Sequence, residues 1–443
     1  MFCRFNTRSC RLVIFLTPAL LLFFSPVNTK AQRPWLEGQV QQQVYAITQV
    51  MMHDVTDPAA AARFYAYSVL TGYEIVCQQE QRLPRFQRAF RNYPVKDYHP
   101  GNSVDIEFSA LYGILETGKA VLPSGYRLEE NQKQLYQLFL MHQVPRDRLD
   151  SSAAFARKIS RQVVDFGNQD GYFKLSTLPR YKPMNTDTAW QPTPPEYMAA
   201  VQPHWSILRP FFLDSATQFK PKPLVPFDTA KTSPFFQLAM DVYRAGKNLT
   251  TTQRLIANFW DCNPFAVQFQ GHMSIGLKKI SPGGHWMGIT GTVCQQKKLG
   301  IDSTLFLYTV VALAVHDAFI SCWTEKYRTN RIRPETVINR FIDEKWQPEL
   351  QTPPFPEYTS GHSVVSTTAA TVLTHYLGDH LAFTDSTETY IGLPPRKFSS
   401  FMQASDEACI SRFYGGIHYM DSINYGRDEG IAIGLFVISR LDR

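Results

Sequence analysis

The chain has 443 residues and a formal net charge of +7, with 44% hydrophobic and 19% charged residues. This composition is that of a globular protein and excludes a disordered or collagen-like chain. The length predicts two packed lobes or one large helical domain. No run rich in lysine and arginine is present, so no nucleic-acid partner is expected.

The first 31 residues have the pattern of a secretory signal peptide. Three arginines precede an apolar run over residues 12–24, and a small-residue cleavage site ends at Ala31. The run is short for a membrane span, which leaves an anchor as the less favoured alternative. Cleavage removes four basic residues and no acidic one, which lowers the net charge from +7 to +3. We expect an exported protein, periplasmic or extracellular, with no membrane span in the mature chain.

Five cysteines remain after the signal peptide, and their wide spacing contains no CxxC pair. A structural zinc site is therefore not predicted. Export would permit disulfides, and the odd number leaves at least one thiol free or paired between chains. These cysteines are Cys77, Cys262, Cys294, Cys322 and Cys409.

Residues 32–167 are expected to form an N-terminal helical region, because apolar residues recur at three- and four-residue spacing. Asp57-Pro58 opens the second helix, and Asp150-Ser151-Ser152 is expected to cap the last one. The expected helices cover residues 37–52, 59–76, 104–121, 128–143 and 153–166.

Residues 168–233 are rich in proline, which disfavours long helices. Because aromatic residues such as Trp190 and Trp205 are frequent here, we expect an ordered, irregular connection that lies over the surface and contributes a pocket wall.

Residues 234–443 are expected to form a C-terminal helical domain. The stretch from Thr304 to His316 contains no charge and predicts a central buried helix, with Asp302-Ser303 as its cap. Glycines at positions 426, 430 and 434 predict close contact between two helices. The fold class is therefore all-α, a helical bundle. Its expected helices cover residues 234–246, 251–260, 301–326, 362–377 and 427–440.

Three clusters carry residue types suited to chemistry. The first runs from Lys326 to Arg333-Pro334, at the end of the long apolar helix. Taken alone, it is more typical of a solvated turn. The second is Ser360-Gly361-His362, which follows a proline-rich stretch and opens a helix. A helix N-terminus presents free amide donors and positive potential to an anion, although an ordinary cap explains it equally well.

The third cluster is the stretch Ser411–Asp421, in which Arg412 and His418 flank two glycines. Arginine offers a planar fork of donors to an oxyanion, and histidine can attack, bind a metal or transfer a proton. Asp421 lies three residues after His418 and is expected to bond one ring nitrogen if the backbone is helical. A glycine turn followed by a helix cap is the alternative interpretation.

Together the clusters contain two arginines, one lysine, a serine hydroxyl, a glycine amide and two histidines. This set can bind a tetrahedral or trigonal-bipyramidal oxyanion. One histidine would then bond the central atom and the other would handle a proton.

At these residues the chain resembles the superfamily of vanadium-dependent haloperoxidases and type 2 phosphatidic acid phosphatases (PAP2), in its secreted bacterial haloperoxidase-like branch. The matching residues are Lys326, Arg333-Pro334, Ser360-Gly361-His362, Ser411-Arg412, His418 and Asp421. Two positions depart from the family pattern. Thr359 replaces the usual proline, and Asp421 follows His418 by three residues where four is usual.

The resemblance implies a helical bundle with an N-terminal helical layer, and a site that holds vanadate. Lys326, Arg333, Ser360, Gly361, His362 and Arg412 would bind its oxygens, and His418 would be the ligand to vanadium. His362 would act as acid and base, Lys326 would polarise peroxide, and halide would be oxidised to hypohalous acid. Asp421 would assist His418. Trp323 and Phe355 match the aromatic residues that line the halide side.

Two other functions stay open at this point. An acid phosphatase would use the same residues without vanadate, with His418 attacking the phosphorus of a phosphomonoester and His362 protonating the leaving oxygen. A non-catalytic protein would keep the anion site as a relic. The expected partners are hydrogen peroxide and halide, or a phosphomonoester. The oligomeric state is open, a homodimer included.

Overall fold

The computed structural model describes residues 33–79, 83–86, 89–90, 93, 96, 98–184, 186–270 and 273–442, so the expected signal peptide lies outside it. The described residues form helices and two small sheets, which confirms the all-α class. The N-terminal helices are α1 (Gln39–His53), α2 (Pro58–Gln79), α3 (Ile106–Val121), α4 (Leu128–Met141) and α5 (Arg146–Gly167). The later helices are α6 (Pro234–Lys247), α7 (Thr251–Phe259), α8 (Pro282–Gln296), α9 (Ile301–Thr329), α10 (Pro334–Phe341), α11 (Gly361–Leu377), α12 (Phe401–Tyr414) and α13 (Met420–Leu441).

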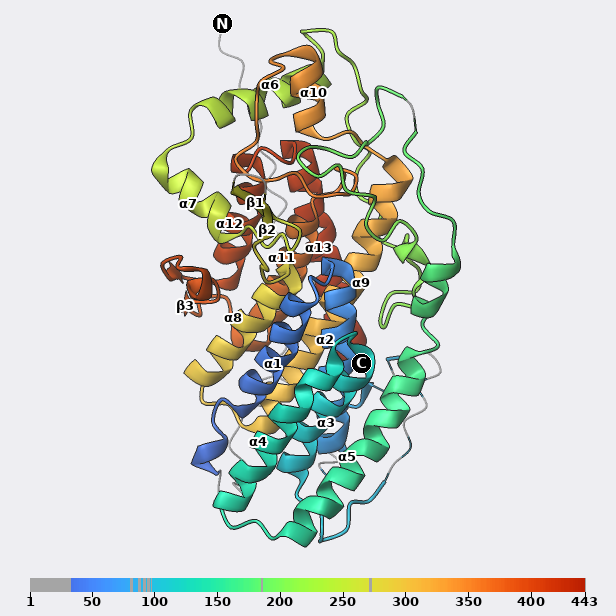
Figure 1. Cartoon of the computed structure of the whole chain (residues 1–443), viewed down its shortest axis with the longest axis vertical. Coiled ribbons are helices and arrows are strands. Elements are labelled where there is room, and N and C mark those ends of the chain that lie inside the picture. Colours follow the sequence, from blue (N-terminus) through green and yellow to red (C-terminus); the bar gives the residue numbers. More distant parts are fainter. Residues whose placement is uncertain are drawn as a thin grey trace, which may run out of the picture.

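The N-terminal helices share a core with the C-terminal bundle. Figure 1 shows α3, α4 and α5 at one end of the long axis and α6 and α10 at the other. Helix α2 packs against both α3 and α9. One hydrophobic cluster therefore extends from Leu36 to Val437 and supports the whole length of the bundle.

Helix α9 is the central helix, and every residue from Thr304 to Trp323 is buried. Its cap is Gly300, so the expectation of a cap at Asp302-Ser303 was wrong. Among the described residues, α9 alone is long and apolar enough to cross a membrane, but 94% of its apolar window is buried inside the protein. This burial is that of the core helix of a helical bundle.

Helices α11 and α13 approach each other closely along the predicted glycine series. A Cβ atom on Gly430 would lie 2.4 Å from the carbonyl oxygen of Val364, and one on Gly434 would lie 2.7 Å from Cβ of Thr371. Only glycine fits such a contact without a shift of the backbone. This packing holds the N-terminus of α11 beside that of α13.

In the described part of the proline-rich connection, the helices are short 3-10 helices at Tyr172–Thr177 and Trp205–Ile207. Trp190 and Trp205 are fully buried, and the backbone is tied to the bundle. Trp190 N donates to the carbonyl of Asn330 at 2.8 Å, and the indole of Trp323 donates to the carbonyl of Val201 at 3.3 Å. The connection therefore packs against the end of α9.

Several elements differ from expectation. Helix α5 begins at Arg146, so Asp150-Ser151-Ser152 lies inside the helix and caps nothing. Helix α13 begins at Met420 instead of residue 427. Helices α8, α10 and α12 were not predicted, and neither were the antiparallel pairs β1 (Val267–Gln270) with β2 (Met273–Gly276) and β3 (Phe383–Asp385) with β4 (Arg396–Phe398).

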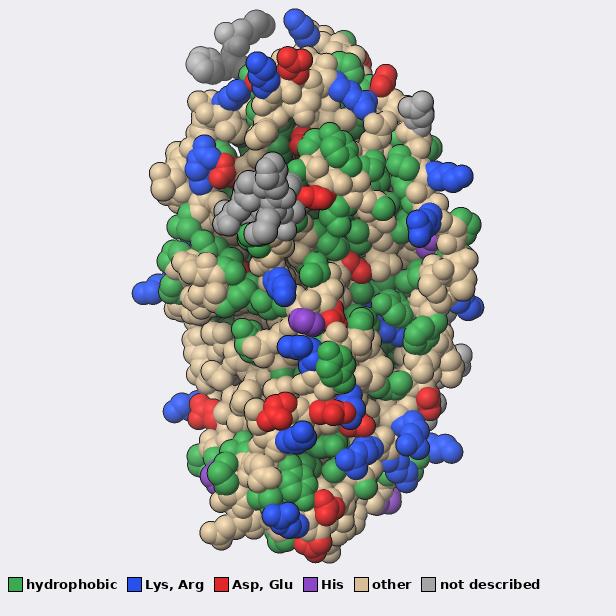
Figure 2. Space-filling view, viewed as in Figure 1, with side chains coloured by type: hydrophobic (Ala, Val, Ile, Leu, Met, Phe, Trp, Pro, Cys, Tyr) green, Lys and Arg blue, Asp and Glu red, His purple; other side chains and the backbone are tan. Residues whose placement is uncertain are grey.

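On the face drawn in Figure 2, acidic and basic side chains are interspersed. All five cysteines of the described chain are buried and free of disulfides. The structure therefore reaches its stability through helix packing, without covalent links among these cysteines.

Candidate active site

The three sequence clusters meet where five helix ends converge. Lys326 lies in the last turn of α9, Arg333 is the residue before α10, and Ser360 is the N-cap of α11. Arg412 lies in the last turn of α12, and His418 lies in the short connection to α13. We call the residues predicted to surround the oxyanion the cage: Lys326, Arg333, Ser360, Gly361, His362, Arg412 and His418. All of them are buried except Gly361 and His362.

Lys326 is held entirely by backbone carbonyls. Its Nζ donates to the carbonyl oxygens of Pro356 at 3.0 Å, Glu357 at 3.1 Å and Thr359 at 2.5 Å. Burial lowers the pKa of Lys326 to about 8, and the nearby Arg333 adds to the effect. The amine is therefore fixed in place, although its surroundings disfavour its charged form.

Arg333 faces His418. Its Nη1 donates to Nε2 of His418 at 3.1 Å and to the carbonyl of Ile417 at 2.8 Å, while Nε donates to the carbonyl of Phe355 at 3.0 Å. Nη2 is buried without a hydrogen-bond partner. Burial lowers the pKa of the Arg333 guanidinium to about 10. Nη2 can therefore donate to an anion without first breaking a hydrogen bond within the protein.

Arg412 is positioned by the C-terminal end of α7. Its Nη2 donates to the carbonyl oxygens of Trp260 at 2.6 Å and Ala257 at 3.3 Å, and its Nε donates to Oγ of Ser411 at 2.9 Å. Burial lowers the pKa of Arg412 as well.

Lys326, Arg333 and Arg412 are three buried cations without a paired carboxylate. Among the described residues, none of them forms a salt bridge, although each is 1% exposed or less. Buried charges are costly unless they are compensated. A site with three buried cations that lack a carboxylate partner is therefore suited to binding an anion.

The N-terminus of α11 adds uncharged donors. Oγ of Ser360 accepts from the backbone N of Ser363 at 3.4 Å and from its hydroxyl at 2.9 Å, which leaves the proton of Ser360 for another acceptor. Gly361 is the first helical residue, so its amide has no partner within the helix.

His362 is partly exposed, but its Nε2 is buried without a partner. Burial, together with the charges of Arg412 and His418, lowers the pKa of His362 well below its usual value. The imidazole is therefore neutral at neutral pH and can accept a proton.

His418 is oriented by Glu357. Its Nδ1 donates to Oε1 of Glu357 at 2.8 Å, which places the other ring nitrogen toward Arg333. Burial and the neighbouring cations lower the pKa of His418 well below its usual value. The neutral ring with Nδ1 protonated leaves Nε2 as the nucleophilic or metal-binding atom.

The expected contact between Asp421 and His418 is wrong. Asp421 instead accepts two hydrogen bonds from Arg331, each of 2.9 Å, and Arg331 also donates to Glu357 at 3.2 Å. Asp421 lies in the first turn of α13, after the chain has turned away from the histidine ring. It thus acts on the site through Arg331 and Glu357.

Sequence reasoning gave no role to Glu357 or Arg331. Both lie inside the clusters that were recognised, Arg331 two residues before Arg333 and Glu357 three before Ser360. A charged residue in a stretch as rich in proline as residues 353–358 is the one signal that could have pointed to Glu357.

Trp323 and Phe355 form an aromatic wall beside the cations. Their ring centroids lie 4.9 Å apart, and Nζ of Lys326 lies 5.1 Å from the centroid of Phe355. The guanidinium carbon of Arg333 also lies 5.1 Å from this ring. The site therefore has one apolar side and one cationic side.

The comparisons with known proteins agree with this geometry. A family model described as the VCPO second helical-bundle domain matches residues 306–443, which contain all the predicted site residues. No curated protein matches the sequence.

Among solved structures, a bacterial vanadium-dependent iodoperoxidase is 39% identical, with a TM-score of 0.83 and coverage of 91% of this chain and 96% of that chain. A bacterial vanadium-dependent chloroperoxidase shares the fold in its holo form, at 16% identity and a TM-score of 0.67, with coverage of 88% of this chain and 93% of that chain. Its apo form is similar, at 17% identity, a TM-score of 0.67 and coverage of 87% and 94%. The chain belongs to the family of vanadium-dependent haloperoxidases.

Proposed function

We propose that the protein is a vanadate-binding haloperoxidase that oxidises halide with hydrogen peroxide, and that iodide is its preferred halide. The observation that carries the proposal is the set of three buried cations without carboxylate partners, Lys326, Arg333 and Arg412. The choice of iodide is supported by the 39% identity to a bacterial iodoperoxidase over nearly the whole chain.

The residues present fit a tetrahedral oxyanion such as vanadate. Two buried nitrogens without partners, Nη2 of Arg333 and Nε2 of His362, accompany the hydroxyl of Ser360 and the amide of Gly361. Arg333, Ser360 and Gly361 offer hydrogen-bond donors, as an anion with several oxygens requires, and Nε2 of His362 can accept a hydrogen bond from a protonated oxygen of the anion. When bound, vanadate supplies a Lewis-acidic centre that activates hydrogen peroxide toward halide.

We assign roles to the residues as follows. Lys326, Arg333 and Arg412 neutralise the anion, and Ser360 and Gly361 donate to it. His418 offers Nε2 to vanadium, because its Nδ1 is committed to Glu357. His362 accepts and returns a proton at Nε2. The orienting role expected of Asp421 passes to Glu357.

The aromatic wall supports the choice of halide. Iodide is the most weakly hydrated and most easily oxidised of the common halides, so it loses least when it leaves water for an apolar surface. Trp323 and Phe355 offer that surface next to Lys326. The cation also keeps the anionic halide near the wall.

The test is a pair of assays on purified protein. One measures oxidation of iodide, bromide and chloride with hydrogen peroxide after incubation with vanadate, and the other measures hydrolysis of an aryl phosphate without vanadate. We expect vanadate-dependent turnover with iodide above bromide. Phosphate hydrolysis without halide oxidation would favour the phosphatase, and no response in either assay would favour the relic.

The matched variants are His418→Ala and His53→Ala. His418 is buried in the cage, whereas His53 is exposed at the end of α1. We expect His418→Ala to abolish vanadate-dependent turnover and His53→Ala to leave it unchanged. Full activity in His418→Ala would overturn the assignment of the site.

We also propose that the protein is exported, on the strength of the basic and apolar pattern of residues 1–31. Fractionation of expressing cells and mass spectrometry of the mature N-terminus test this. We expect the chain outside the cytoplasm, beginning at Gln32. An intact Met1 terminus in the cytoplasmic fraction would contradict export.

A further inference from the structure

A second cluster of ligand-type side chains lies outside the oxyanion cage. Cys262 follows α7, His285 lies in the first turn of α8, and Glu388 precedes the 3-10 helix Thr389–Ile391. All three side chains are 1% exposed or less. Their ligand atoms lie within 4.8 Å of one another, so three separate segments bring one thiol, one imidazole and one carboxylate to a single point.

The spacing of these atoms fits a tetrahedral metal ion. Nδ1 of His285 lies 3.0 Å from Oε1 of Glu388 and 3.5 Å from Sγ of Cys262. Sγ lies 3.9 Å from Oε1. Zinc bonds to nitrogen, oxygen and sulfur at tetrahedral angles separate the ligand atoms by roughly 3.3–3.7 Å. Shifts of a few tenths of an ångström would therefore complete the coordination.

The far side of the imidazole is already fixed. Nε2 of His285 lies 2.6 Å from Oδ2 of Asp385, and the backbone N of Thr387 donates to the other oxygen of Asp385 at 2.9 Å. Metal-binding histidines nearly always donate their second nitrogen to such a group, which orients the ring and raises its basicity. Asp385 therefore aims Nδ1 at the thiol and at Glu388.

A salt-bridged imidazolium is the simplest alternative, with Nδ1 of His285 and the thiol of Cys262 both donating to Oε1 of Glu388. In that arrangement two donors share one carboxylate oxygen, and Sγ lies 3.5 Å from Nδ1. A cation between the three atoms would satisfy all of them at once. We propose that Cys262, His285 and Glu388 bind a divalent cation of the zinc type, a site distinct from the vanadate cage.

Trp260 connects the proposed cation site to the cage. The ring of Trp260 stacks on His285, with centroids 4.4 Å apart, and the carbonyl of Trp260 accepts the 2.6 Å bond from Arg412. A cation would join the loop after α7 to α8 and to the loop after β3. It would thereby hold in place the backbone that positions Arg412.

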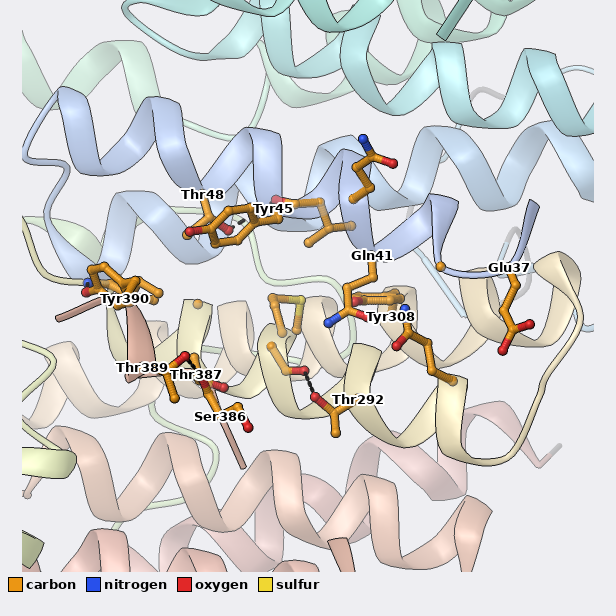
Figure 3. A pocket seen from close by; sticks show the side chains of 18 residues that line it. Glu37, Gln41, Tyr45, Thr48, Thr292, Tyr308, Ser386, Thr387, Thr389 and Tyr390 are labelled. Carbon is orange, nitrogen blue, oxygen red and sulfur yellow. Dashed lines mark hydrogen bonds between the residues drawn. The ribbon is translucent and has the colours of Figure 1, made fainter. Parts of the chain in front are cut away.

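A pocket of about 590 Å³ adjoins the same segments (Figure 3). Gly284 and Gly288 of α8 line it on either side of His285 in sequence. Ser386, Thr387 and Thr389 line it from the loop that carries Asp385 and Glu388. The pocket therefore lies beside the segments that carry the cluster, and three protein ligands would leave the fourth position of a tetrahedral ion for a water molecule.

The test uses the full chain expressed in cobalt-supplemented medium and purified without vanadate. Bound metal is measured by mass spectrometry, and the thiolate ligand by its charge-transfer absorption to Co²⁺. We expect one Co²⁺ per chain with this absorption in the wild type. Cys262→Ser should lose the absorption, whereas Cys294→Ser, which changes a buried cysteine of α8 outside the cluster, should retain it.

Asp385→Asn serves as a second variant if Cys262→Ser does not fold. It keeps all three ligands but weakens the orientation of His285, so metal affinity should fall about 10- to 100-fold. A wild-type protein that holds neither cobalt nor zinc overturns the proposal. The same holds for an absorption that persists in Cys262→Ser, or for unchanged affinity in Asp385→Asn. Haloperoxidase activity is not part of this readout, so the cage and the cation site are tested separately.

Discussion

Glu357 accepts a 2.8 Å hydrogen bond from Nδ1 of His418, across 61 residues of sequence. It also accepts from the backbone N of Tyr419 at 3.2 Å and from Arg331. These bonds hold the imidazole in one tautomer and one orientation, with Nε2 facing Arg333. The carboxylate that controls the proposed vanadium ligand therefore comes from the proline-rich stretch before α11, and not from α13.

Glu357→Gln should weaken vanadate binding by about 10- to 100-fold, the usual effect of removing a group that orients a metal-binding histidine. The amide keeps the volume but can present its NH₂ to Nδ1 and favour the wrong tautomer. The measurement is activity as a function of added vanadate. Asp421→Asn should have the smaller effect, because Asp421 reaches His418 only through Arg331 and Glu357. A larger loss in Asp421→Asn would contradict this order.

Sulfate, a tetrahedral oxyanion whose charge is constant between pH 7 and pH 9, should stabilise the vanadate-free protein less at pH 9 than at pH 7. Burial holds the pKa of Lys326 at about 8, below its ordinary 10.5. Below pH 8 the folded and unfolded chains both keep this proton. Between pH 8 and 10.5 only the unfolded chain keeps it, so the folded cage loses a positive charge and binds an oxyanion more weakly.

The measurement for Lys326 is the sulfate-induced rise in melting temperature at the two pH values. Lys326→Met is the control, since it removes the group that titrates. Its sulfate effect should be small and nearly independent of pH in this window. A sulfate effect that grows from pH 7 to pH 9 in the wild type would be inconsistent with a lysine that titrates near pH 8.

The cage could be predicted from the sequence because its residues occur in short local patterns. Lys326 and Ser360 lie at helix ends that an apolar run or proline and glycine mark in the sequence, whereas the helices beside Arg333 and Arg412 were not predicted. The partner of His418 could not be predicted, because the choice between Glu357 and Asp421 depends on how the chain folds between them. The spacing of three residues predicted Asp421 as the partner of His418. In the structure α13 begins at Met420, and the carboxylate of Asp421 bonds Arg331 instead.

The missed helices have physical reasons too. Helix α10 begins at Pro334, and proline disfavours the interior of a helix although it is well suited to the first turn. Helix α8 opens with Pro282-Gly283-Gly284, and glycine has low helix propensity. Packing against α9 overrides that propensity. Because α8 was not predicted, the position of His285 in its first turn was not predicted either.

Glu429→Gln should stabilise the protein at pH 8 and have little effect at pH 4. Burial raises the pKa of Glu429 to about 7 from 4.5. At low pH the folded and unfolded chains are both protonated. Above pH 4.5 the unfolded carboxyl ionises first, so the stability of the wild type falls as the pH rises toward 7. The difference is at most about 3 kcal/mol at pH 8.

Urea denaturation of both proteins at the two pH values measures this difference. Ser321 and Thr359 now donate to different oxygens of Glu429, at 2.7 and 2.8 Å. Gln keeps an acceptor for one hydroxyl and has an amide that can donate to the other. Equal stability of variant and wild type at pH 8 would show that Glu429 titrates normally.

Gly430→Ala should destabilise the protein by about 1–3 kcal/mol, the usual cost of an added methyl group in a packed interior. The new Cβ would lie 2.4 Å from the carbonyl oxygen of Val364 and 2.9 Å from Cβ of Thr367, so α11 and α13 would have to separate. Because α11 carries Ser360, Gly361 and His362 at its N-terminus, the same shift should weaken vanadate binding. Gly101→Ala is the control, since a Cβ there meets nothing closer than 3.7 Å. Melting temperature and vanadate titration of both variants measure the two effects, and equal melting temperatures would rule out a tight α11–α13 contact at Gly430.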